Sequence, residues 1–348
     1  MSVVINGREK FIIDRTLITI TQKSLDRNTI HENGLAEFII NLKKIGVDFF
    51  EIDERTFNYV GPLIISEAFI FRIDELKQLE FCRKSGIEYI IIKEENLELV
   101  NICNNNNYNF KIILEIGTNL FKRNNINKII DVNKLFSIRV KGENNWLFND
   151  YITTNCNVKT DMYASNEFSM ATSIGFQAIS RGYSYVTTSF CGKDGVYGTT
   201  ALEELLVALQ VILGTKINGE ISLLSQMRKQ YEKITHCKLP NNKPVIGVDV
   251  FKYESGVHVA GIQKNPETYE PFKPELVGLE RKLALGKHSG KNSVICKLKE
   301  LGIENEFNVC DIITILEKVK NISISNKVEL SDKDFIEICS TIERLHYV

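Results

Sequence analysis

The feature that most constrains this chain is the alternation of short apolar runs with helix-like stretches over its first two thirds. The apolar runs are rich in β-branched residues and lack polar alternation, which indicates strands buried on both faces. Such strands, joined by crossover helices, form a parallel α/β sheet. We expect strands at residues 11–13, 47–52, 89–92, 110–116, 135–140 and 184–189, with helices at 29–44, 75–85 and 201–213.

Two architectures fit this order of elements, a (β/α)8 barrel and a doubly wound sheet, and periodicity alone does not separate them. No G-x-G-x-x-G sequence follows the first expected strand. Pro and Asn residues between Lys238 and Asn242 mark a boundary. We therefore expect a barrel-like domain at residues 1–238. An extended segment, a Gly-rich loop and helices should form an appendage at residues 239–348.

The overall composition argues against several classes of protein. The formal net charge is −1 over 348 residues, so binding to nucleic acid or to a membrane through bulk charge is not expected. No apolar run reaches the length of a membrane span, and the first residues do not resemble a signal peptide. The eight cysteines include no C-x-x-C pair, which predicts free thiols in the cytoplasm rather than disulfides or a zinc site.

Two sequence patterns in the second half of the chain are long and specific. Residues 244–290 contain E-S-G-V-H at 254–258, K-N-P-E-T-Y-E-P-F at 264–272 and G-K-H-S-G at 286–290. The second pattern, G-T-T-A-L-E-E, occupies residues 198–204. Together they resemble the motifs of the homocitrate synthase and 2-isopropylmalate synthase family, and most closely those of its nitrogenase-associated homocitrate synthases.

This resemblance implies a fold and a chemistry. In the family a (β/α)8 barrel is followed by a linker and helices that reach over a partner's barrel. A divalent metal at the barrel mouth is held by an Asp, two His of an H-x-H motif and an Asn. The metal polarises the keto group of a 2-oxo acid, which is Lewis-acid chemistry. A base removes a proton from the methyl group of acetyl-CoA, and the resulting carbanion equivalent attacks the keto carbon.

The metal ligands of the family are replaced in this chain. Residues 14–22, D-R-T-L-I-T-I-T-Q, are similar to the family's D-x-T-L-R-D-G-x-Q, but Thr19 stands at the metal-binding Asp. The H-x-H motif falls on Tyr163 and Ser165, and the metal-binding Asn falls on Thr199. Neutral hydroxyls are poor substitutes for a carboxylate and two imidazoles at a divalent site. We therefore expect no metal or other cofactor in this chain.

Part of the expected barrel is also short. The stretch between Glu143 and Tyr163 is brief for a βα unit, which takes roughly 30 residues, and the family's A-D-T-x-G sequence is absent from the chain. We therefore expect a degenerate (β/α)8 TIM barrel with about one βα unit shortened. Glu143 itself resembles a family glutamate near the substrate, over a short match.

Other polar residues near expected strand ends have a structural interpretation. We interpret Asp14 and Gln22 as relics that hold the end of the first strand, and Glu51 as a structural acid. The sequence K-D-G at 193–195 stands where the family has G-x-G-E-R. Because the Glu-Arg pair is missing, we interpret this segment as a plain loop.

His258 is the main catalytic candidate because it lies inside the best-preserved motif. In the family, the matching His enters the active site of the other subunit and works there with a glutamate in acid–base chemistry. Histidine suits this role because its charge changes near neutral pH. The segment at 286–290 has two interpretations, an anion site at a helix N-terminus or a turn that packs the two domains together, and the sequence does not separate them.

We interpret the chain as a homocitrate synthase-like subunit whose own barrel cannot bind the catalytic metal. The resemblance implies the omega chain of the family's split form, with a catalytically intact alpha chain as partner. Acetyl-CoA and 2-oxoglutarate would be the substrates of the complex, an acyltransferase that supplies homocitrate for the iron–molybdenum cofactor of nitrogenase. The isolated chain should be inactive. Two other classes stay open: a non-catalytic regulator or scaffold related to isopropylmalate or citramalate synthases, and a metal-free enzyme rebuilt on the barrel.

Overall fold

The protein consists of two compact units, residues 1–239 and 240–348, each with its own apolar core. The computed structural model describes residues 3–5, 7–23, 32–60, 69–106, 108–117, 131, 134–142, 158–303 and 307–345. No helix in these ranges is both long enough and apolar enough to cross a membrane.

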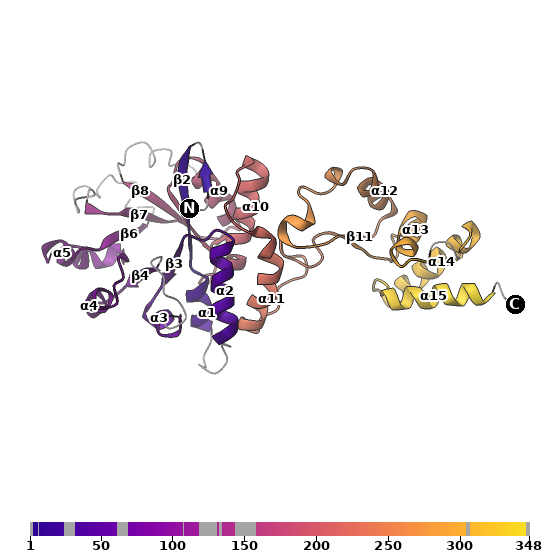
Figure 1. Ribbon diagram of the computed structural model, residues 1–348, viewed down its shortest axis with the longest axis horizontal. Coiled ribbons are helices and arrows are strands. Elements are labelled where there is room, and N and C mark those ends of the chain that lie inside the picture. Colours follow the sequence, from indigo (N-terminus) through magenta and orange to yellow (C-terminus); the bar gives the residue numbers. More distant parts are fainter. Residues whose placement is uncertain are drawn as a thin grey trace. The chain divides into compact units, whose positions relative to one another are not determined.

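The first unit is a closed barrel of parallel strands (Figure 1). Within the described residues its eight strands are β2 (Arg8–Asp14), β3 (Phe49–Ile52), β4 (Phe69–Ile73), β5 (Tyr89–Lys93), β6 (Lys111–Gly117), β7 (Ser137–Gly142), β8 (Lys159–Ala164) and β9 (Tyr185–Ser189). Each strand pairs in parallel with the next, and β2 also pairs with β9. This last pairing closes the sheet. The (β/α)8 interpretation is therefore confirmed over the doubly wound sheet.

Helices surround the outside of this barrel (Figure 1). Their bounds are α1 (Thr16–Lys23), α2 (Glu32–Lys44), α3 (Glu54–Val60), α4 (Leu76–Lys84), α5 (Leu97–Asn105), α9 (Ala171–Ser180), α10 (Leu202–Leu213) and α11 (Leu224–Thr235). Short strand β1 (Val3–Ile5) pairs antiparallel with β2, and β10 (Thr200–Ala201) pairs with β9. Residues 143–157, which include Glu143 and the expected shortened unit, lie between β7 and β8 and outside the described residues.

The barrel interior is stacked in layers, because every second residue of a strand points inward. Five aromatic rings lie together at the amino ends of the strands, with neighbouring ring centres 5.1 to 6.2 Å apart: Phe11, Phe49, Tyr89, Phe136 and Tyr185. The isoleucines Ile13, Ile70, Ile91 and Ile113 pack onto these rings. The next inward positions on β3, β4 and β6 lie two residues beyond Phe49, Ile70 and Ile113. All three are charged: Glu51, Arg72 and Glu115.

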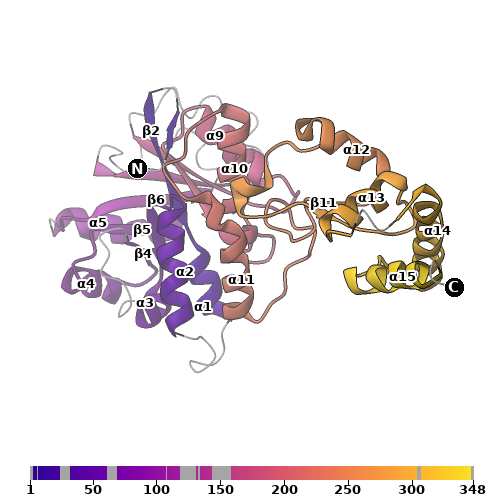
Figure 2. The ribbon, with the colours of Figure 1, turned by 45° about the vertical axis from the view of Figure 1, so that its right-hand side comes forward.

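The second unit is mainly helical (Figure 2). It contains strands β11 (Lys252–Tyr253) and β12 (Lys282–Leu283), paired in parallel, and helices α12 (Gly256–Lys264), α13 (Lys291–Glu300), α14 (Val309–Asn326) and α15 (Asp332–Leu345). Helices α13 to α15 share a core that includes Val294, Leu298, Ile315, Val319 and Phe335. The side chain of Asn308 caps α14 by accepting the N–H groups of Cys310 and Asp311.

Candidate functional site

Two of the four positions that replace metal ligands are bonded to backbone carbonyls of the barrel unit. Thr19 lies on α1, directly after β2, and is buried. Its hydroxyl donates to the carbonyl oxygen of Thr16 at 2.7 Å. The buried hydroxyl of Thr199 donates to the carbonyl oxygen of Ala164 at 2.7 Å. Each hydroxyl proton is therefore already used by the chain's own backbone.

Tyr163, at the end of β8, takes part in a side-chain cluster at the barrel mouth. Its phenol donates to Asp194 at 2.6 Å, and burial raises the pKa of this phenol. The guanidinium carbon of Arg15 lies 4.8 Å from the centre of the Tyr163 ring, and its Nε donates to Asp194 at 2.8 Å. The loop at 193–195, interpreted from the sequence as a plain loop, thus contributes a carboxylate to this cluster.

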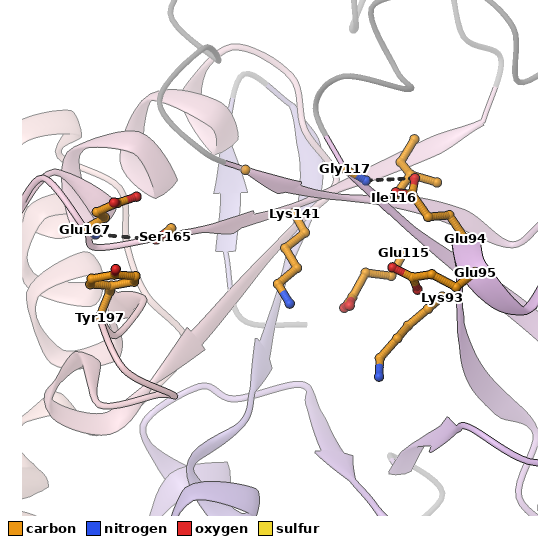
Figure 3. A pocket seen from close by; sticks show the side chains of 11 residues that line it. Lys93, Glu94, Glu95, Glu115, Ile116, Gly117, Lys141, Ser165, Glu167 and Tyr197 are labelled. Atoms are coloured by element: carbon orange, nitrogen blue, oxygen red, sulfur yellow. Dashed lines mark hydrogen bonds between the residues drawn. The ribbon is translucent and has the colours of Figure 1, made fainter.

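Ser165 differs because it faces a cavity of about 370 Å³ at the carboxyl ends of β5 to β8 (Figure 3). The charged side chains that line this cavity are Lys93, Lys141, Glu94, Glu95, Glu115 and Glu167. No three His, Cys, Asp or Glu side chains of the described residues are arranged to hold a metal ion. The four substituted positions offer neutral hydroxyls where the resemblance implies a carboxylate, two imidazoles and an amide, and hydroxyls fit a divalent metal poorly.

A buried ion network fills the barrel below this mouth. Glu51 accepts hydrogen bonds from Arg15, Arg72 and Arg139. Arg72 also donates to Glu115, with a shortest distance of 2.6 Å. Arg139 donates to Asp161 at 2.5 Å, and Thr187 donates to the same carboxylate at 2.9 Å. Every charge in this network therefore has an opposite charge in direct contact.

The network also fixes the ionisation of its carboxylates. Burial alone would raise the pKa of Glu51, but the guanidinium groups around it more than offset burial and hold that pKa far below its ordinary value. The same balance, with Arg72 as the main neighbour, lowers the pKa of Glu115 to about 2. A carboxylate held ionised among arginines is a poor general base. The structural interpretation of Glu51 therefore fits its surroundings.

Sequence reasoning singled out only Glu51 in this network. The available signal was a charged residue flanked by apolar residues in a strand-like run, as Arg72 is in F-I-F-R-I at Phe69–Ile73 and Arg139 is in S-I-R-V-K-G at Ser137–Gly142. In a barrel such a residue points inward and must meet an opposite charge on another strand.

Asp14 joins the end of β2 to the segment that follows β9. Its carboxylate accepts both the N–H and the hydroxyl of Thr16 at 2.9 Å. The Thr16 hydroxyl in turn accepts the N–H of Phe190. Burial raises the pKa of Asp14 to about 7. These contacts fit its interpretation as a relic that holds the strand end, whereas Gln22 is exposed.

His258 has different surroundings, because it lies exposed on α12 in the second unit. The centre of its ring is 4.7 Å from the centre of the Tyr269 ring, which is 42% exposed. Gly261, three residues after His258, makes room for this tyrosine, since a Cβ there would lie 2.2 Å from the Tyr269 ring. Sequence reasoning missed Tyr269, although it belongs to the preserved K-N-P-E-T-Y-E-P-F segment.

The segment at 286–290 forms a turn that the preserved motif itself anchors. Glu254 accepts the N–H of His288 at 2.7 Å, and its carbonyl oxygen accepts the hydroxyl of Ser293 at 3.0 Å. Ser289 accepts the N–H of Gly286 at 2.9 Å. These contacts show that the segment is a turn, and all of them lie within the second unit. Both expected roles, an anion site and a turn that packs the two domains together, stay predictions.

Comparisons with known proteins agree with the sequence patterns. A family model described as "homocitrate synthase post-HMGL domain-like" matches residues 245–327. Over 97% of its length the chain is 33% identical to "homocitrate synthase, omega subunit" from Clostridium pasteurianum, and it covers 97% of that protein. It is also 37% identical, over 53% of its length, to homocitrate synthase AksA from Methanothermobacter thermautotrophicus, and covers 47% of that protein.

The barrel unit also resembles solved structures. Hydroxymethylglutaryl-CoA lyase from Pseudomonas aeruginosa superposes with a TM-score of 0.54 at 10% sequence identity, over 66% of this chain and 94% of that chain. At this identity the likeness concerns the fold alone, a TIM barrel.

Proposed function

Because this chain belongs to the homocitrate synthase family, we propose that it is one subunit of a heteromeric homocitrate synthase. The complex would condense acetyl-CoA with 2-oxoglutarate and water to give homocitrate and CoA. The similarity to an omega subunit over nearly the whole chain supports this, since that name implies an alpha chain as partner. The second subunit would be a homologue with intact metal ligands.

The observation that carries the proposal is a contrast within the chain. The hydroxyls of Thr19, Tyr163 and Thr199 are all bonded to the chain's own carbonyl or carboxylate oxygens. His258, by contrast, is exposed beside Tyr269 in the best-preserved motif. We therefore propose that the divalent metal belongs to the partner subunit, and that this chain brings His258 to the partner's site in trans.

In this proposal His258 moves a proton in the partner's site, together with an acid–base group that the partner supplies. The neutral imidazole can accept a proton at one ring nitrogen, and the imidazolium can return it. The Tyr269 ring, which Gly261 allows to pack on α12, would limit the orientations that the imidazole can take. A positioned acid–base group of this kind contributes roughly 10²–10⁴-fold to a rate.

We extend the proposal to a biological role, the supply of homocitrate for the iron–molybdenum cofactor of nitrogenase. The support is the resemblance of residues 244–290 to nitrogenase-associated members of the family. Deletion of this chain in its source cell should abolish growth on N₂ but not on ammonium, and added homocitrate should restore growth on N₂. Normal growth of the deletion strain on N₂ would contradict this role.

Reconstitution tests the biochemical proposal. The purified chain, the purified partner and their mixture are assayed for thiol release from acetyl-CoA with 2-oxoglutarate, 2-oxoisovalerate or pyruvate. Only the mixture should turn over, with 2-oxoglutarate and at an ordinary rate of ~1–10³ s⁻¹. Turnover by this chain alone would reveal a rebuilt site. Full activity of the partner alone would make this chain a regulator or scaffold.

A further inference from the structure

An open cavity of about 610 Å³ runs along α12, from Ser255 to Lys264, and reaches the start of α13 in the second unit; we call it the α12–α13 cavity. The two helix starts are in close contact, since a Cβ on Gly256 would lie 3.1 Å from the Cα of Gly290. Tyr269, whose ring packs on His258, forms part of the cavity wall. The cavity therefore adjoins the residue proposed to carry out proton transfer.

The charged groups that line this cavity have one sign. Lys264 and Lys291 line it together with His288, and none of the residues that line it is acidic. The nearby carboxylate of Glu254 is not part of the lining, because it accepts the N–H of His288 and lies against Gly286. The first turns of both helices also begin at this cavity, and their partial positive charge adds to that of the lysines.

We propose that the α12–α13 cavity binds an anionic group of a substrate, a phosphate or a carboxylate, while His258 acts on the reacting atoms. This inference rests on the proposed function. Two lysines at the cavity would form charge-assisted hydrogen bonds with such a group. A cavity of several hundred Å³ accommodates a ligand much larger than one carboxylate. The diphosphate and ribose phosphate of coenzyme A therefore fit better than the second carboxylate of 2-oxoglutarate.

Direct binding to the full chain provides a test that needs no catalysis. Amide resonances of the ¹⁵N-labelled chain are followed during titration with coenzyme A and, separately, with 2-oxoglutarate. We expect coenzyme A to shift the amide signals of Val257 and Asn292. The Lys264→Ala/Lys291→Ala double variant should bind about tenfold or more weakly. The matched control is Lys333→Ala, which removes an exposed lysine of α15 and should bind like the unmodified chain. Absent shifts, or equal affinity in the double variant, would overturn the proposal.

Kinetics of the reconstituted complex then distinguish the two sources of the anion. The double variant should raise KM for acetyl-CoA about tenfold and leave kcat unchanged. Its KM for acetyl-pantetheine, which lacks the phosphates, should not change. A rise in KM for 2-oxoglutarate instead would assign the cavity to a carboxylate. Unchanged KM values for both substrates would overturn the proposal although the complex is active. An inactive unmodified complex would contradict the proposed function. The titration would still test whether the cavity binds coenzyme A.

Discussion

The barrel mouth and the start of α12 carry the two halves of one family pattern, and their side chains are in opposite situations. At the barrel mouth, Thr19 and Thr199 are buried and bonded to backbone carbonyls, and Tyr163 is bonded to Asp194. On α12, His258 is exposed, and the adjacent Val257 is 71% exposed. The barrel half of the pattern is therefore mostly buried and bonded within the protein, whereas the α12 half is exposed to solvent.

This difference is what the proposed function predicts for a barrel mouth that no longer binds metal and a second unit that acts on a partner. A buried hydroxyl that donates to a partner inside the protein is held in one orientation, and a neutral hydroxyl is in any case a poor ligand for a divalent ion. An imidazole, an aromatic ring and an aliphatic side chain exposed together do little for the stability of their own unit. Exposed apolar side chains grouped in this way are typical of interaction sites. The comparison therefore supports the proposal that this chain contributes to catalysis through its second unit.

The largest effect should come from His258→Ala in the reconstituted complex. Loss of a positioned acid–base group should lower kcat by ~10²–10⁴-fold. Assembly and metal content should stay nearly unchanged, because the exposed imidazole does not support the fold. Thiol release and size-exclusion chromatography measure the two properties. The matched control is His236→Asn, an exposed histidine at the end of α11 with a φ of 52°, where Asn is tolerated. An unchanged kcat of the complex with His258→Ala would mean that the second unit acts only as a scaffold.

The next largest effect should appear in the barrel, from Glu51→Gln. This change leaves Arg15, Arg72 and Arg139 without their shared carboxylate, and breaking a buried ion pair costs about 3–5 kcal/mol. Urea unfolding followed by circular dichroism measures the loss. Glu88→Gln is the control, since its pair with Lys111 is exposed and should contribute at most about 1 kcal/mol. Equal losses in the two variants would show that the barrel network is no more important than a surface pair.

A smaller effect concerns acid stability. The pKa of Glu115 is lowered to about 2, so the unfolded chain binds this proton more tightly than the folded one. The stability from Glu115 is therefore present above its ordinary pKa near 4.5 and is lost as the pH falls toward 2. The raised pKa of Asp14 acts in the opposite sense, because its contribution to the stability of the folded chain is lost as the pH rises through about 7. Asp14 is present both in the unmodified chain and in a Glu115→Gln variant, so its contribution cancels when the two are compared.

Comparison with Glu115→Gln isolates this contribution. The unmodified chain should be more stable at pH 6, and the two proteins should converge as the pH falls, with slopes that differ by up to about 1.4 kcal/mol per pH unit. Urea unfolding at a series of pH values between 3 and 6 measures the difference. Parallel curves over that range would mean that Glu115 titrates alike in the folded and unfolded chains.

The sequence predicted the strands whose local pattern is apolar and left out two others. β4 and β8 were not expected. The sequence of β8, K-T-D-M-Y-A, contains no apolar run, whereas β4, F-I-F-R-I, was missed although Glu51 and Arg139 are similar inward charges in strands that were expected. These charges are tolerated because partners on other strands neutralise them, and no local pattern records such partners. Periodicity left the choice between barrel and open sheet undecided for a similar reason, and the family resemblance correctly favoured the barrel. Closure depends on the pairing of Phe11 with Tyr185, far apart in the chain.

The candidate site was predictable where it depends on a motif and unpredictable where it depends on contacts. Thr19, Tyr163 and Thr199 could be located by their positions in the family pattern. Asp194, which accepts the Tyr163 phenol, lies 31 residues further along the chain in a loop with no distinctive sequence. The contact between Tyr269 and His258 likewise could not be predicted from the sequence. It depends on the absence of a side chain at Gly261, which leaves room for the Tyr269 ring.

The smallest effect, and the sharpest test of the barrel half of the comparison, should come from Thr19→Asp. It restores the one carboxylate of the family's metal site, yet we expect no gain in affinity for Mg²⁺, Mn²⁺ or Zn²⁺ by calorimetry. Divalent ions need several ligands at once, and Tyr163, another of the four substituted positions, has a phenol whose pKa is raised by burial and which is bonded to Asp194. Thr19→Asn controls for the added volume at this buried position. A stoichiometric micromolar site in Thr19→Asp, absent from Thr19→Asn, would mean that the barrel mouth is one substitution away from function. The same site in the unmodified chain would remove the contrast between the two regions altogether.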